Sequence, residues 1–70
     1  MVKDKIQYLV AFIAEFASKY NLTQPQAVRY LQRYHALELF DKHYDFLHTH
    51  SFASNIEDVT AYCRRFGGQL

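Results

Sequence analysis

The sequence contains few of the residues on which many common folds and sites depend. Its one cysteine, Cys63, can form no disulfide within the chain and cannot by itself supply a multi-cysteine zinc site. A lone thiol is typical of a reducing compartment, so we expect a cytoplasmic protein. Two glycines and one proline leave few chain breaks, and no alternating apolar pattern predicts a strand.

A surplus of charge of one sign is also lacking. Eight basic and seven acidic residues give a formal net charge of +1, which lends no support to broad electrostatic binding of nucleic acid or of an acidic membrane. The longest apolar run, Tyr8–Ala14, stops at Glu15 and is far shorter than the roughly 20 residues that span a bilayer. We therefore expect no membrane association.

Large aromatic side chains, by contrast, are abundant. Half of the residues are hydrophobic, and the chain has six tyrosines and six phenylalanines, which excludes a disordered segment. The length predicts one domain, residues 1–70, which buries only about 60% of the surface that its unfolded form exposes. Two interpretations stay open: an aromatic-packed monomer, or a protein that covers aromatic surface with a second copy or a protein partner.

The segment Ile6–Tyr20 predicts the central helix. Tyr8 and Phe12 lie one turn apart on it, outside the main apolar stripe, and we expect them to form an exposed patch for self-association or a protein partner. Tyr30 is a weaker candidate for the same surface. The alternative is that a later helix covers Tyr8 and Phe12. The stripe that we expect to face the core is about 120° wide on a helix and consists of Ile6, Leu9, Val10, Ile13, Phe16, Ala17 and Tyr20.

The second helix has a specific start signal. Thr23 and Gln26 have the spacing of a capping box, and Pro25 falls in the first turn, where its missing N–H costs little. A break at His35–Ala36 precedes the third helix. We expect this helix to be short, Leu37–His43.

The remaining segments complete the predicted fold. Tyr44–His50 is expected to be irregular. A capping-box pattern at Ser54–Glu57 predicts the start of the last helix, and Gly67-Gly68 predicts its end. The apolar face of that helix includes Phe66 and Cys63, whose thiol we expect to be buried and unreactive. The sequence thus predicts an all-α fold, a single small domain of about four short helices packed around the N-terminal helix.

Groups that could carry chemistry are sparse. His43, His48 and His50 lie close in sequence, but they lack the spacing of a zinc finger or metalloprotease site. No phosphate loop, nucleotide fingerprint or hydrolase elbow is present. We therefore expect no catalytic residue, metal, cofactor or small-molecule substrate.

Two arginines define the alternative function. Arg29 and Arg33 lie one turn apart on the second helix, where they form an ordinary solvated face or contact an anion or nucleic acid. The segment Lys19–Tyr34 reads as helix, short turn and helix, which is the pattern of a DNA-binding helix-turn-helix. The near-neutral charge counts against this alternative.

The segment Tyr44–Thr49, with the sequence YDFLHT, resembles a motif of a family of short bacterial helical domains of unknown function. The resemblance extends to Ile6–Tyr20, to Leu22-Thr23 with Ala27, and to Ile56–Phe66. His50 departs from the glutamine more usual at its position. Genes of this family often lie beside genes for ADP-ribosyltransferase-like proteins, which implies a toxin–antitoxin or enzyme–regulator pair.

We expect the motif itself to be structural and not catalytic. Its members are Tyr44, Asp45, Leu47, His48 and Thr49. Tyr44 and Leu47 continue the apolar face of Phe40, and we expect His48 to bond to backbone near the start of the last helix. Taken together, the sequence predicts a non-enzymatic protein-interaction module that binds either a heteromeric partner or a second copy of itself.

Overall fold

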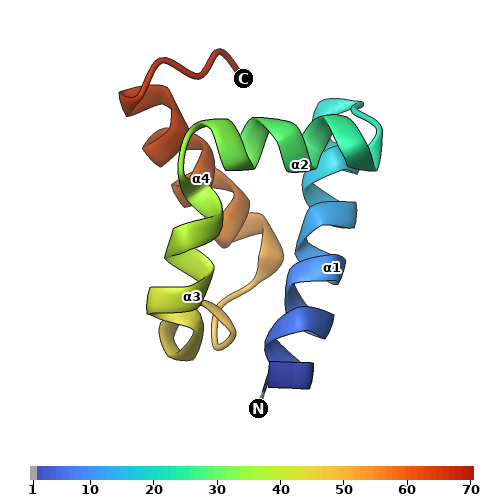
Figure 1. Ribbon diagram of the computed structural model, residues 1–70, viewed down its shortest axis with the longest axis vertical. Helices are drawn as coiled ribbons and strands as arrows, with labels where there is room; N and C mark the ends of the chain where they lie inside the picture. The colour runs from blue at the N-terminus through green and yellow to red at the C-terminus, as the bar shows by residue number, and fades with distance from the viewer. Residues whose placement is uncertain (1) are drawn as a thin grey trace.

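The computed structural model describes residues 2–70, with side chains described from residue 5 onward. The described chain forms four helices: α1 (Val2–Tyr20), α2 (Gln24–Arg33), α3 (Ala36–Leu47) and α4 (Phe52–Arg65). Helices α1, α3 and α4 contact one another, and α2 lies across one end of this group (Figure 1). The predicted all-α fold of about four helices packed around the N-terminal helix is confirmed.

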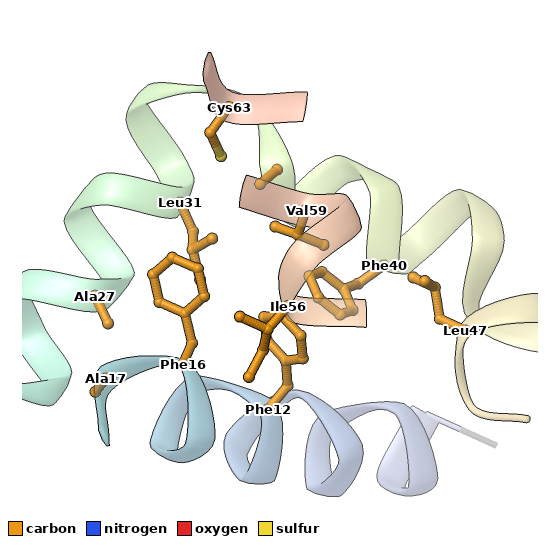
Figure 2. Close-up of a cluster of buried hydrophobic side chains, with 11 residues drawn as sticks. Phe12, Phe16, Ala17, Ala27, Leu31, Phe40, Leu47, Ile56, Val59 and Cys63 are labelled. Carbon is orange, nitrogen blue, oxygen red and sulfur yellow. The ribbon is translucent and has the colours of Figure 1, made fainter. Parts of the chain in front are cut away.

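The core is centred on the aromatic side of α1. Phe12 and Phe16 are completely buried and point from α1 toward residues of the other three helices (Figure 2). Their rings lie 6.0 Å apart, and Phe12 also lies 4.6 Å from the ring of Phe40 on α3. The remaining buried apolar residues are Ala17, Ala27, Leu31, Ala36, Leu47, Ile56, Val59 and Cys63.

The predicted orientation of α1 is right only in part: Phe16 and Ala17 are buried and Leu9, Ile13 and Tyr20 pack against the core, but the buried face is turned toward Phe12. Ile6 and Val10, assigned to the core stripe, are 57% and 58% exposed, whereas Phe12 is 0% exposed. A buried aromatic ring removes more apolar area from water than a valine or isoleucine side chain does. Because three helices pack on α1, the helix can turn until its aromatic residues occupy the shared interior.

The predicted start of α2 is confirmed in detail. Asn21 closes α1 in the left-handed conformation, with φ 55°. The Thr23 backbone N–H donates to Gln26 Oε1 at 2.9 Å, and the Gln26 N–H donates to Thr23 Oγ1 at 3.2 Å, which completes the capping box. His35, with φ 65°, then separates α2 from α3 at the predicted break.

Helix α3 is longer than predicted. It continues to Leu47 with non-helical dihedral angles at His43 (φ −121°, ψ 24°), so the predicted end at His43 marks a kink and not a terminus. The helix resumes because Leu47 is buried and Tyr44 partly buried against α1. The expectation of an irregular Tyr44–His50 was consequently wrong for its first four residues.

Helix α4 begins earlier than predicted. Its N-cap is Ser51, whose Oγ accepts the Ser54 backbone N–H at 3.1 Å, so Ser54 lies inside the helix. This start allows Phe52 to stack on the Tyr8 ring at 5.3 Å and places Asn55 in the interior. Phe66, expected on the buried face, is 53% exposed because it follows the last helical residue.

Candidate interaction surface

An open groove runs between α3 and α4. Its volume is about 530 Å³. Because the two helices run antiparallel (Figure 1), the start of α3 lies beside the end of α4 along this groove. From α3 the groove is lined by Leu39, His43, Phe46 and Leu47, and from α4 by Asp58, Val59, Ala61, Tyr62 and Arg65.

The groove has an apolar floor and a charged margin. Leu47 and Val59 form the buried floor, while Phe46 stands at one wall with 59% of its surface exposed. Asp58 and Arg65 are exposed on the α4 wall. Apolar and aromatic surface surrounded by charge is the usual composition of a protein-binding patch.

Phe46 is held at this wall by the end of α3. The His50 ring stacks on it with centroids 4.3 Å apart, and His50 Nδ1 lies 2.9 Å from the Phe46 carbonyl oxygen. Thr49 Oγ1 donates to the same carbonyl at 2.8 Å. These contacts satisfy a helix-terminal carbonyl that has no partner within the helix. The sequence assigned Phe46 no role, and its exposure could not be read from the YDFLHT pattern.

His48 makes a similar contact two residues earlier. Its Nδ1 lies 2.8 Å from the Tyr44 carbonyl oxygen, and its ring stacks on Tyr44 at 4.7 Å. Because a carbonyl oxygen only accepts, each of these contacts is a hydrogen bond in the tautomer that carries the proton on Nδ1. The predicted backbone bond of His48 is therefore present, but it caps α3 itself and does not reach the start of α4. Leu47 is buried as predicted, whereas Asp45 is exposed.

A buried polar network holds Leu47, which lies on the floor of the groove. Asn55, which is 0% exposed, donates through Nδ2 to the Tyr8 hydroxyl and to the Leu47 carbonyl, each at 2.7 Å. The Tyr8 hydroxyl donates to the same carbonyl at 3.2 Å, and burial raises the pKa of Tyr8. One asparagine thus joins the last turn of α3 to α1 and α4. Its Oδ1 has no hydrogen-bond partner among the described residues.

The aromatic patch predicted on α1 is not a surface. Phe12 is fully buried, and Tyr8 is partly buried between Phe40, Tyr44 and Phe52. The prediction failed because α3 and α4 both cover this side of α1, which was the stated alternative. Tyr8 and Phe12 therefore cannot form an exposed interface.

Tyr30 is also partly covered. The C-terminal residues fold back over it, and the Leu70 backbone N–H donates to its hydroxyl at 3.5 Å. A side chain at Gly68 would collide with this hydroxyl. Burial raises the pKa of Tyr30. The weaker candidate of the predicted interface is thus in contact with the tail of its own chain.

The sequence also raised roles for Arg29 and Arg33, for a metal site and for Cys63. Arg29 and Arg33 are exposed on α2, and the Arg33 guanidinium lies 5.8 Å from the Tyr34 ring centroid. Within the described residues, no group of three His, Cys, Asp or Glu side chains could hold a metal ion. Cys63 is 0% exposed as predicted, and burial raises the pKa of its thiol to about 11. No described helix has the length and apolar character needed to cross a membrane.

The fold and the groove define a small all-helical protein with an open, aromatic-walled surface. The chain belongs to the family described as protein of unknown function (DUF3791), whose sequence model matches residues 7–65. The match includes all of α2, α3 and α4, and hence the whole groove. Comparison with curated proteins finds no match, and comparison with solved structures finds none either.

Proposed function

We propose that this chain is a non-enzymatic protein-interaction module whose binding surface is the α3–α4 groove. The observation that carries the proposal is the exposure of Phe46 on the wall of this groove, 59%. Aromatic side chains in contact with a partner often supply much of the binding free energy. The Asn55 network supports the proposal further, because it holds the end of α3, and with it the wall, in a fixed position.

The resemblance of the YDFLHT segment to its family favours a regulatory role. We propose that the partner is an ADP-ribosyltransferase-like protein encoded nearby, which this chain would neutralise or regulate in the manner of an antitoxin. A standard interface takes about 800 Å² from each protein. The total accessible surface of the chain is 4754 Å², so a partner that buries such an area would cover the helices around the groove as well as the groove itself.

The test compares two variants that remove equally exposed apolar side chains. Phe46→Ser changes the groove, and Ile6→Ser changes the outer side of α1, where the exposure is 57%. Each protein is titrated by calorimetry into the neighbouring ADP-ribosyltransferase-like protein. We expect Phe46→Ser to weaken binding by about tenfold or more and Ile6→Ser to leave it unchanged. Equal effects, or no complex with the wild-type chain, would contradict the proposal.

DNA binding by α2 is the second candidate. It is favoured by the exposure of Gln24, Gln26 and Arg29 near the start of a helix that follows a three-residue turn. The net charge of +1 disfavours it. A salt titration with random duplex separates the two candidates, because phosphate contacts make the logarithm of affinity fall linearly with the logarithm of salt concentration.

A further inference from the structure

The α4 wall of the groove carries a symmetric pattern of side chains. Asp58, Ala61, Tyr62 and Arg65 recur at steps of three, one and three residues, so they form one stripe along the helix. An acidic side chain stands at one end of the stripe and a basic one at the other. The midpoint falls between Ala61 and Tyr62, the first small and exposed and the second a partly buried aromatic.

Neither of the two charges at the ends of this stripe has an ion-pair partner among the described side chains. Among the described side chains, the ion pairs are Lys5 with Asp41 and His35 with Glu38, and neither includes Asp58 or Arg65. The two residues are seven positions apart on one helix, which is about 10 Å at 1.5 Å per residue. They therefore do not neutralise each other, and both can meet charges on another molecule.

From this pattern we infer that, in the free protein, a second copy of this chain occupies the groove. The inference rests on the proposed function, since it takes the groove as a protein-binding surface, and it names the occupant. A two-fold axis through the midpoint of the stripe sets two α4 helices antiparallel. Asp58 of each copy then faces Arg65 of the other, and Ala61 allows the helices to approach closely. A two-fold interface requires a self-complementary surface of this kind.

The α3 wall fits the same arrangement. Phe46 and Leu39 lie toward opposite ends of the groove. In an antiparallel pair, Phe46 of one copy therefore meets the end of the groove that contains Leu39 of the other. The contact repeats by symmetry, so two exposed phenylalanine rings leave water at once. A heteromeric partner that uses the groove must displace the second copy.

The sharpest test exchanges the two charges. In a two-fold pair, Asp58→Lys alone and Arg65→Glu alone each replace both attractive contacts by repulsive ones, and we expect each to weaken self-association by about tenfold or more. The double variant Asp58→Lys/Arg65→Glu restores both contacts with reversed sign. An equimolar mixture of the two single variants restores them as well. In the mixed pair, positions 58 and 65 are both basic in the Asp58→Lys protein and both acidic in the Arg65→Glu protein, so each contact joins opposite charges.

The full-length chain and its variants are compared by sedimentation equilibrium over a range of concentrations, with Glu57→Lys, an exposed change outside the stripe, as the matched control. We expect the double variant and the mixture to recover the wild-type dissociation constant to within about threefold, and the control to retain it. Strictly monomeric wild-type protein overturns the inference, as does a double variant no better than the single ones. Neither result bears on the proposed function, which is tested separately by Phe46→Ser in titrations with the enzyme-like partner.

Discussion

The coupling between Tyr8 and Asn55 is the feature of this fold whose energy can be predicted most closely. Asn55→Ala removes two hydrogen bonds of 2.7 Å from a site with no exposure. At a net contribution of about 1 kcal/mol each, the free energy of unfolding should fall by about 2 kcal/mol. The Leu47 carbonyl keeps the Tyr8 hydroxyl as a donor, so no further penalty for an unpaired carbonyl is expected.

Tyr8→Phe removes the other member of this network. It leaves one Asn55 N–H without an acceptor, and we expect it to cost about 1–1.5 kcal/mol. The double variant loses the shared bond only once, and the Leu47 carbonyl still accepts the His50 backbone N–H at 3.1 Å, so its cost should fall short of the sum of the single costs by about 1 kcal/mol. Urea unfolding monitored by circular dichroism measures all four proteins of the cycle.

A matched control comes from the other end of α1. The Tyr20 hydroxyl lies 2.8 Å from Thr60 Oγ1, so Tyr20→Phe also removes one tyrosine hydrogen bond. Tyr20 makes no hydrogen bond to Asn55, and the two substitutions should be additive within about 0.5 kcal/mol. If the costs of Tyr8→Phe and Asn55→Ala add as closely as those of the control pair, the two residues are not coupled and the network as described is refuted.

Further outcomes follow from the burial or exposure of individual side chains. Phe12→Ala should lower the free energy of unfolding by about 3–5 kcal/mol. Ile6→Ala, at a site that is 57% exposed, should change it by no more than about 0.5 kcal/mol. Thermal melts of both variants measure the difference. The raised pKa of Cys63, about 11, keeps the neutral thiol in the folded state, so a thiol reagent should react only on unfolding. The free energy of unfolding should also fall as pH rises from 9.0, the pKa of an unperturbed thiol, to about 11, because in this window the unfolded chain loses the thiol proton and the folded chain keeps it. His48→Ala removes an exposed bond and should cost less than about 1 kcal/mol, so a larger loss in a urea titration would mean that His48 supports more than the end of α3.

Local signals in the sequence predicted α2 well. The hydrogen bonds of a capping box join residues three positions apart, so Thr23 and Gln26 specify the start of the helix without help from distant contacts. The face of α1 could not be chosen in the same way. Nearly every residue from Ile6 to Ala14 is apolar, and periodicity then allows several faces. The choice depended on α3 and α4, which pack around Phe12.

The groove could not be predicted from local signals, because its shape depends on contacts between residues far apart in the sequence. Ser51 and Ser54 can both cap a helix, and the earlier start is the one that stacks Phe52 on Tyr8 and buries Asn55. Asn55 carried no signal of burial, because asparagine is mostly exposed in proteins. The exposure of Phe46 follows from the kink at His43 and from the way α4 packs against α3, neither of which the YDFLHT pattern specifies.

Mapping amide resonances shows directly whether the α3–α4 groove is the interaction surface. The backbone amide spectrum of the uniformly ¹⁵N-labelled chain is recorded at increasing protein concentration and then with the ADP-ribosyltransferase-like protein. If the groove binds both partners, both series shift resonances of groove residues on α3 and α4, with Phe46, Ala61 and Tyr62 among the largest changes. Shifts concentrated at the start of α2, or on the outer side of α1 around Val10, with the groove unchanged, would contradict the proposal that the groove is the interaction surface.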